Sequence, residues 1–350
     1  MNILLLHEFS GVHTELQAGL RELGHNARTA NFGDGFRGFP TDIKLGNLET
    51  SVSGIIRRAL TQVGLIEQFR KFDVVQSITA NAFNPLVSWL MEAAVLKNPE
   101  QRFVYLAASG DTVYRKHVRA LPYSPELDWY ERELQGANER RIFDAANQIV
   151  AGAWDYLFSF RREGYSPTFI PFPVMTRRIT PRAVAQGQKL RVLHPVNRAD
   201  GDDYKGTSFI RTAFDLLRKK FGTDVEFIAV GGLPYAEYME IANTCDVLVD
   251  QANTMSYGMS AIYALAQGKV VLSGCEEIAH ELEMHRVAPV INIRPDAADI
   301  ATKLEALLAD RARMKDIGIA SRLHAEKFHD AIVVAEQYAN VYRAVRAAGR

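Results

Sequence analysis

The sequence predicts an α/β protein made of two doubly wound parallel sheets. Short apolar runs alternate with longer amphipathic segments along the chain, which is the pattern of parallel strands joined by helices. With 350 residues, the chain is long enough for two domains that each bury a core. The alternation stops once, in a stretch rich in Arg, Pro and Gly at residues 174–189, which we interpret as a linker.

The first domain is predicted at residues 1–175. It begins with an apolar strand at residues 2–6, then a loop and a helix whose leucines recur at helical spacing before Gly24 ends it. Further strands are predicted at residues 25–30, 73–78, 102–108 and 147–152. Helical segments fill most of the gaps between these strands, as a doubly wound sheet requires.

The second domain is predicted at residues 176–328, where the alternation restarts without being a sequence repeat. Its strands are predicted at residues 190–196, 225–232, 246–251, 269–274 and 288–293. Its helices are predicted at residues 208–221, 235–245, 257–268 and 275–285. A last helix at residues 329–350 has no strand after it, so we expect it to pack across the linker or back on the first domain. Two such domains leave a ligand-binding cleft between the carboxyl ends of their sheets.

Composition narrows the class of partner and the compartment. The 41 basic and 41 acidic residues cancel, so no overall field favours nucleic acid, and none is expected as a partner. The two cysteines, Cys245 and Cys275, lack a metal-binding spacing and are predicted to be buried thiols of a reducing, cytoplasmic protein. The N-terminal apolar run is too short for a signal peptide, and no segment approaches the roughly 20 apolar residues of a membrane span.

Two cations stand where the first strand of the second domain meets its helix. Arg198 and Lys205, with the N–H groups of Gly206, Thr207 and Ser208, could hold a diphosphate and stabilise its charge as it leaves. The alternative is a solvated loop whose cations pair with nearby acidic residues, namely Asp200, Asp202 and Asp203.

The first domain has an equivalent junction after its first strand. Ser10 and Gly11 would let a ligand approach the backbone, and His13 lies in the first helical turn, although such a glycine is more often only turn chemistry. No G-x-G-x-x-G follows this strand, which argues against an NAD-binding domain.

Two more junctions carry polar residues. After the strand at 102–108, Asp111 could hold a sugar hydroxyl and Arg115 a phosphate or an acid, or Asp111 could be a helix N-cap paired with Arg115. In the second domain Gln251 follows a strand, and the next helix begins near Gly258, facing the same cleft as Lys205.

An amphipathic segment at residues 52–72 raises the question of membrane contact. Basic residues flank it, namely Arg57, Arg58, Arg70 and Lys71. It could lie on an anionic membrane, or it could be a helix with one core face and one solvated basic face.

Taken in order, these junctions resemble the family 4 glycosyltransferases of GT-B fold. In that family the second domain opens with a strand, an Arg and a "KG" before the helix, matched here by Arg198, Lys205 and Gly206. The family then has a Tyr-Gly or Phe-Gly loop and a helix ending in "EAMACGKPVV", and "SYGMSAIYALAQGKVVLSG" follows that frame. The resemblance spans nearly the whole chain, although only the Lys-Gly and Tyr-Gly segments are specific.

The resemblance implies two facing Rossmann-like domains, with a UDP- or GDP-linked sugar held mainly by the second. The diphosphate would rest on Arg198, Lys205 and the helix start at Gly258, with no bound metal and no cofactor. The other donor-binding residues implied are Gly11, Asn197, Gly206, Thr207, Gln251, Tyr257, Met259 and Tyr263. Asp111 would join Arg198 and Lys205 in catalysis. The acceptor would enter from the first domain, near Ser10, His13, Ser109 and Arg115.

One departure from the family concerns the donor ribose. The family usually has two glutamates separated by seven residues, and these positions hold Met255 and Tyr263 here. A phenol cannot give the two-oxygen grip of a carboxylate on the ribose. Either Tyr263 binds the ribose differently, or Glu276 or Glu277 takes over from the next loop, or donor binding is altered.

The sequence therefore leads to a cytoplasmic, retaining glycosyltransferase of hexosyltransferase type. Its acceptor would be a glycan or a lipid-linked sugar in surface polysaccharide biosynthesis, which leaves room for peripheral contact with the inner membrane; the oligomeric state stays open. One alternative is a nucleotide-sugar 2-epimerase, for which Asp111, Glu276 and Glu277 are candidate carboxylates. Another is a non-catalytic binding protein. Lys205→Ala would distinguish the two classes, because it should abolish the turnover of an enzyme with little effect on stability and leave the partner binding of a binding protein intact.

Overall fold

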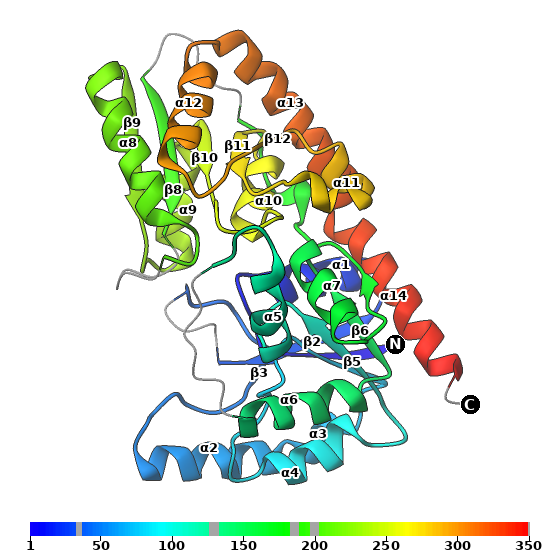
Figure 1. Cartoon of the computed structure of the whole chain (residues 1–350). Coiled ribbons are helices and arrows are strands. Elements are labelled where there is room, and N and C mark those ends of the chain that lie inside the picture. Colours follow the sequence, from blue (N-terminus) through cyan, green and yellow to red (C-terminus); the bar gives the residue numbers. More distant parts are fainter. Residues whose placement is uncertain (33–36, 126–132, 183–188, 197–202, 349–350) are drawn as a thin grey trace.

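The computed structural model describes residues 1–32, 37–125, 133–182, 189–196 and 203–348. It contains a seven-stranded sheet of order β3-β2-β1-β4-β5-β6-β7 and a five-stranded sheet of order β12-β11-β10-β8-β9. The strands of both sheets pair in parallel. Figure 1 shows the two sheets in separate domains with helices packed on their faces. The predicted α/β class with two doubly wound sheets is confirmed. Residue 175, the predicted end of the first domain, falls in the sequence between the last strand of one sheet and the first strand of the other.

The N-terminal sheet comprises β1 (Asn2–Leu6), β2 (Asn26–Asn31), β3 (Ile43–Lys44), β4 (Val74–Ser77), β5 (Arg102–Ala107), β6 (Gln148–Ala151) and β7 (Thr168–Phe169). Its helices are α1 (Val12–Glu22), α2 (Val52–Gly64), α3 (Ile66–Phe69), α4 (Ser88–Met91), the π-helical η2 (Glu92–Leu96), α5 (Thr112–His117), the 3₁₀ turn η3 (Val118–Ala120), α6 (Glu133–Ala145) and α7 (Trp154–Arg162). The inner strand β1 is buried almost throughout because helices cover both faces of the sheet.

The C-terminal sheet comprises β8 (Leu190–Pro195), β9 (Val225–Val230), β10 (Val247–Val249), β11 (Val270–Ser273) and β12 (Val290–Asn292). Its helices are α8 (Thr207–Phe221), α9 (Tyr235–Asn243), α10 (Met259–Ala266), α11 (Glu283–Arg286), α12 (Ala297–Leu308) and α13 (Arg311–Phe328), with 3₁₀ turns η4 (Thr176–Arg178) in the linker and η5 (Glu277–Glu281). The helix predicted at 275–285 is wrong as one element. It is split into η5 and α11 because Leu282 between them has an extended backbone.

The last helix, α14 (Ala331–Ala348), returns to the N-terminal domain and packs against α1, as predicted (Figure 1). At the crossing, Val174 of the linker donates its N–H to the His329 carbonyl at 2.7 Å and accepts from the Ala331 N–H at 2.9 Å. Further along α14, the Tyr342 hydroxyl donates to Gln76 Oε1 of β4 at 2.7 Å. The helix thus belongs structurally to the first domain, although it follows the second.

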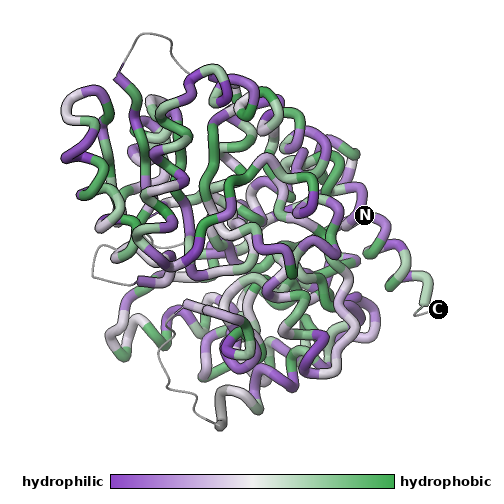
Figure 2. Tube along the Cα trace, turned by 45° about the horizontal axis from the view of Figure 1, so that its top comes forward, coloured by the Kyte–Doolittle hydropathy of each residue, from purple (hydrophilic) through white to green (hydrophobic). Residues whose placement is uncertain are grey.

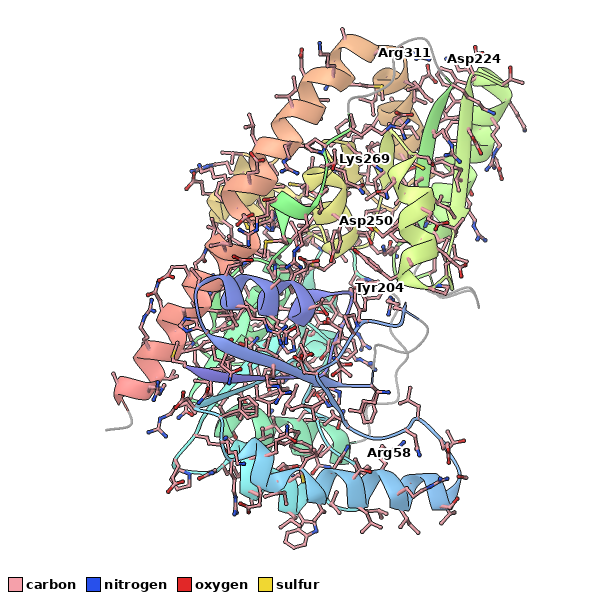
Figure 3. The ribbon with its side chains drawn as sticks, turned by 180° about the vertical axis from the view of Figure 1, so that it is seen from behind. Arg58, Tyr204, Asp224, Asp250, Lys269 and Arg311 are labelled. Carbon is pink, nitrogen blue, oxygen red and sulfur yellow. The ribbon has the colours of Figure 1, made fainter. Side chains whose placement is uncertain are left out.

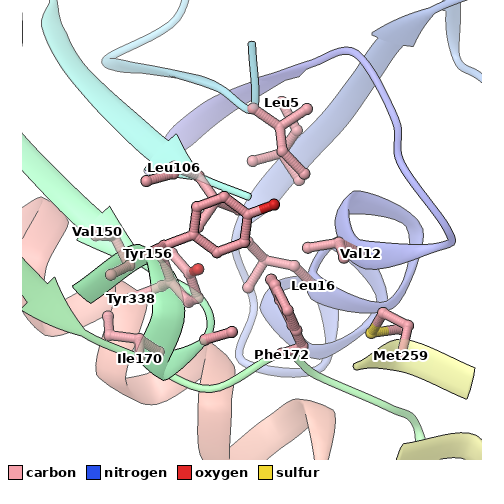
Figure 4. Packing of buried hydrophobic residues seen from close by; sticks show 14 of the residues in the cluster. Leu5, Val12, Leu16, Leu106, Val150, Tyr156, Ile170, Phe172, Met259 and Tyr338 are labelled. Atoms are coloured by element: carbon pink, nitrogen blue, oxygen red, sulfur yellow. The ribbon is translucent and has the colours of Figure 1, made fainter. Parts of the chain in front are cut away.

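One hydrophobic cluster runs through both domains. Along many helical turns the tube in Figure 2 alternates between hydrophobic and hydrophilic residues, as expected of helices with one buried face. Figure 4 shows Met259 of α10 at the edge of a cluster that also contains Phe172 and Val12 of the N-terminal domain. The domains therefore meet over packed side chains rather than across open solvent.

Candidate active site between the domains

A cavity of about 270 Å³ lies between the domains, at the carboxyl ends of strands from both sheets. Tyrosines from both domains line it, namely Tyr114, Tyr156, Tyr204, Tyr235, Tyr238, Tyr257 and Tyr263. Figure 3 shows Tyr204 where the two domains meet and Asp250 in the C-terminal domain nearby. The residues predicted from sequence that line the cavity are Ser10, Lys205, Gln251, Tyr257, Gly258, Met259 and Tyr263. An aromatic cavity with a few converging polar groups is the usual form of a small-molecule site.

Lys205 faces this cavity from the loop before α8. Its Nζ donates to Asp250 Oδ1 at 2.6 Å and to Ser260 Oγ, in the first turn of α10, at 3.3 Å. Asp250 follows β10 and is fully buried, and its Oδ2 has no hydrogen-bond partner among the described residues. The solvated-loop alternative is therefore wrong for Lys205, because the side chain is buried against an aspartate of another loop.

The start of α8 is already occupied by an acidic side chain. Asp203 Oδ1 accepts the Ser208 N–H at 2.8 Å, and its Oδ2 accepts the Ser208 hydroxyl at 2.5 Å. Gly206 takes the left-handed conformation that turns the chain into the helix, with φ 74°. The Thr207 hydroxyl is held by His194 Nε2 at 2.9 Å. The Ser208 N–H group, which was predicted to face a diphosphate, is thus held by Asp203, an aspartate that was expected to pair with a cation.

Helix α10 offers a freer N-terminus to the cavity. Gly258 precedes it in an extended conformation, and no described side chain accepts a hydrogen bond from its first N–H groups. Gly258, Met259 and Ser260 all line the cavity, next to the ammonium of Lys205. These N–H groups and this cation could together hold an anion in the cavity. Two predicted residues, Asn197 and Arg198, lie outside the described residues.

The predicted residues of the first junction separate into two groups. Ser10 lines the cavity, and Gly11 has a left-handed φ of 88° and lies so close to Tyr263 that a Cβ atom would be 2.8 Å from its hydroxyl. His13 is buried behind them and does not line the cavity. It donates to the His7 carbonyl at 2.8 Å and meets Gln76 Nε2 at 3.1 Å, and burial lowers its pKa to about 4. His13 therefore acts as a neutral structural residue.

Asp111 lies behind the cavity wall. The Tyr105 hydroxyl donates to Asp111 Oδ2 at 2.5 Å, and burial raises the pKa of this carboxyl to about 7. Asp111 occupies the N-cap position of α5, as one interpretation predicted, but its side chain makes no capping hydrogen bond, and Arg115 donates to the Gly110 carbonyl at 2.7 Å instead of pairing with it. Ala108 lines the cavity, whereas Ser109, Asp111 and Arg115 do not.

Two carboxylates that were not predicted from the sequence accept hydrogen bonds from Met255 and Tyr263. The Tyr263 hydroxyl donates to Glu15 Oε1 at 2.8 Å, and the Met255 N–H donates to Asp155 Oδ1 at 3.0 Å. Burial raises the pKa of both carboxyls. Both belong to the N-terminal domain and lie in the first turn of a helix that follows a strand, α1 or α7. That placement was the signal available in the sequence.

The glutamates suggested as substitutes in the next loop do not line the cavity. Glu276 accepts hydrogen bonds from Arg294 Nε at 2.8 Å, Asn292 at 2.6 Å and the Tyr123 hydroxyl at 2.7 Å. Burial alone would raise its pKa, but these hydrogen bonds lower it to about 2. Glu277 is exposed.

Gln251 and Tyr257 shape the loop before α10. Gln251 Nε2 donates to Thr254 Oγ1 at 2.8 Å and to the Ser256 carbonyl at 2.9 Å. Tyr257 lines the cavity with its ring, while its hydroxyl is bonded to His324 Nε2 at 2.9 Å at the end of α13. Both predicted donor residues thus fix the loop that presents the N-terminus of α10.

No protein-family model matches the chain, and no curated protein matches it in sequence. Solved structures match over nearly its whole length. Sucrose-phosphate synthase from Thermosynechococcus elongatus has a TM-score of 0.69 and 15% identity, covering 99% of this chain and 100% of that one. HepE from Anabaena, in complex with UDP-glucose, has a TM-score of 0.66 and 13% identity, and the match covers 98% of this chain and 100% of that one. UDP-GlcNAc 2-epimerase from Neisseria meningitidis, bound to UDP-GlcNAc, has a TM-score of 0.54 and 12% identity, and the match covers 93% of this chain and 99% of that one.

Fold and cavity together define the class. The chain has the GT-B fold, with two facing Rossmann-like domains, a cavity between them and a C-terminal helix that crosses back. At these identities the likeness establishes the fold, and the chemistry must be argued from the cavity itself.

Proposed function

We propose that this protein is a retaining glycosyltransferase, similar to family 4, that needs no bound metal and uses a UDP- or GDP-linked sugar. The observation that carries the proposal is the pairing of the Lys205 ammonium with the N-terminus of α10 in one cavity between the domains. HepE in complex with UDP-glucose, a protein of the same fold, supports a nucleotide-linked donor. The acceptor would be a glycan or a lipid-linked sugar, as in surface polysaccharide biosynthesis.

The chemistry that these groups supply is stabilisation of a leaving diphosphate. When the bond between the sugar and the phosphate breaks, negative charge develops on the diphosphate oxygens. The N–H groups at the start of α10 and the Lys205 ammonium would face that charge in a cavity lined largely by aromatic side chains, where such interactions are stronger than in water. Arg198 would add a second cation. Because Lys205 is paired with Asp250 in the structure, donor binding would require it to exchange that partner for a phosphate oxygen.

Incubation with a panel of UDP- and GDP-sugars tests the proposal. We expect slow donor hydrolysis without an acceptor, and transfer when a glycan or lipid-linked acceptor is present, both followed by release of UDP or GDP. Inorganic phosphate and free sugars serve as controls for non-specific binding. If no donor binds at millimolar concentration while the protein is folded, the proposal fails.

A nucleotide-sugar 2-epimerase is the second candidate. The likeness to the Neisseria meningitidis epimerase and the buried carboxylates of Asp155 and Asp250 in the cavity favour it. NMR of the sugar after incubation without an acceptor separates the two functions. An epimerase changes the configuration at C2, whereas a transferase leaves the donor intact or hydrolyses it. A non-catalytic binding protein would bind a nucleotide and do neither.

Peripheral contact with the inner membrane is a further part of the proposal, and helix α2 supports it. This helix buries one face, at Gly54, Ala59 and Gln62, as expected for a helix with one core face, but its exposed face is apolar as well as basic. Val52, Ile56 and Leu60, spaced four residues apart, face outward and are 75%, 47% and 66% exposed. Basic side chains stand beside this stripe, including Arg58, which Figure 3 shows on the same helix. No helix in the described part of the chain is long and apolar enough to span a bilayer.

A flotation assay tests the contact. Wild-type protein is expected to float with anionic vesicles, and Ile56→Glu with Leu60→Glu is expected to abolish flotation because charges would enter the apolar layer. Leu216→Glu, which also changes an exposed leucine but in α8 of the other domain, is the matched control. Equal flotation of all three proteins would refute a role for α2.

A further inference from the structure

We infer that the N-terminus of α10 is held in its anion-binding position by two carboxylates of the opposite domain, Asp155 and Glu15. The donor site is then complete only when the domains are closed, although the groups that would touch the phosphate belong to the C-terminal domain. This inference rests on the proposed function for its ligand, and on the contacts below for its geometry.

Asp155 holds the loop that leads into α10. It lies in the first turn of α7, lines the cavity and is buried. Its Oδ1 accepts the Met255 N–H at 3.0 Å, and its Oδ2 accepts the Ser256 hydroxyl. Both carboxylate oxygens are therefore engaged by residues just before the start of α10. The same loop is confined from behind, because a Cβ atom on Gly274 would overlap the Thr254 carbonyl.

Glu15 holds α10 one turn further on. Its Oε1 accepts the Tyr263 hydroxyl at 2.8 Å, and its Oε2 accepts the N–H of Met175 in the linker at 2.7 Å. Gly11, which precedes α1, makes room for the Tyr263 hydroxyl. Glu15 thus joins α1, the linker and α10 at one point. The two carboxylates flank the segment whose N–H groups face the cavity.

The contacts of Asp155 and Glu15 hold the segment that leads into α10, whereas other contacts across the domain interface do not. Glu281 of the C-terminal domain also bridges the domains, accepting from Trp154 Nε1 at 2.6 Å and from Arg161 at 3.0 Å. Its side chain is 47% exposed, and it does not line the cavity. Glu281 is therefore a matched control, because its loss loosens the interface without touching the loop before α10.

Removing Asp155 leaves the Met255 N–H and the Ser256 hydroxyl unpaired in a buried place, so the loop must rearrange to find new partners. The start of α10 would then shift relative to Lys205, and the anion site would lose its geometry. Removing Glu15 takes away the hydrogen bond that joins Tyr263 to the N-terminal domain. Both residues act as positioning residues, since neither needs to contact the donor in this role.

Hydrogen exchange and nucleotide titration test the inference together. In the nucleotide-free full-length protein, Asp155→Ala and Glu15→Ala are expected to speed amide exchange in residues 254–263 at least tenfold, whereas Glu281→Ala leaves it unchanged. In titrations with UDP and with GDP, the first two variants are expected to lose about tenfold in affinity for whichever nucleotide binds. Unchanged exchange at 254–263 in both variants would overturn the inference.

Two further variants cover the other outcomes. If Asp155→Ala does not fold, Ser256→Ala removes one of the two bonds to Asp155 and should still speed exchange in this segment. For Glu15, the Glu15→Ala and Tyr263→Phe losses of affinity should add less than fully in the double variant, because both remove the bond between Glu15 and Tyr263; fully additive losses would refute action through Tyr263. If wild-type protein binds neither nucleotide, the proposed function fails, while the exchange data still decide the positioning role.

Discussion

Lys205→Ala should reduce donor turnover by at least about 100-fold and also destabilise the fold. The loss of turnover follows from removing a preorganised cation from the leaving diphosphate, an effect of this size in enzymes with comparable groups. The loss of stability follows from Asp250, which would be left buried without its ion-pair partner. Breaking a buried pair on one side typically costs about 3–5 kcal/mol. The sequence-based expectation of little effect on stability is therefore replaced.

A double variant separates the two effects. In Lys205→Met with Asp250→Asn the buried charge is gone on both sides, so the free energy of unfolding should recover much of the loss while turnover stays absent. Urea unfolding and release of UDP or GDP measure the two quantities on the same preparations. Turnover within tenfold of wild type in Lys205→Ala would exclude the ammonium from the diphosphate site.

Gly19→Ala should lower the free energy of unfolding by about 1–3 kcal/mol, the usual cost of overpacking. Gly19 lies in the middle of α1 where α14 crosses it, and an added Cβ would overlap the Ala331 carbonyl. The backbone of α14 cannot withdraw locally, because Ala331 is also bonded to Val174 of the linker. In a helix free of such a contact the same substitution is stabilising by about 0.5–1 kcal/mol.

Gly64→Ala provides that comparison. Gly64 ends α2, and a Cβ added there has no atom within 4 Å. Thermal and urea unfolding should therefore show opposite signs for the two substitutions. A stabilising effect of Gly19→Ala, like that expected of Gly64→Ala, would mean that α14 does not press on α1 at this point.

The sequence predicted the fold well because its signals are local. Apolar runs and helical spacing lie within a few residues of one another, and they mark the strands and most helices. Lys205 was found for the same reason, since a cation before a glycine at a strand-to-helix junction is visible in a short window. The returning helix was predicted because no strand follows it.

The missed parts of the site depend on contacts between distant residues. Glu15 meets Tyr263 and Asp155 meets Met255 across the domain interface, and no spacing in the sequence relates the members of either pair. The hydrogen bond from the Ser208 N–H to Asp203 was missed for another reason, since Asp203 was expected to pair with a cation. A carboxylate and a phosphate satisfy the same N–H groups, so the pattern fits both.

The return of α14 has a consequence for how the protein is made. The first domain is not finished when the ribosome has passed residue 175, because the surface of α1 around Gly19 is covered only by a segment synthesised after the whole second domain. Tyr338 and Tyr342, both fully buried, must find that surface late. Folding of the N-terminal half therefore waits for the C-terminal half, and nascent chains stalled before α14 should expose this apolar face to chaperones.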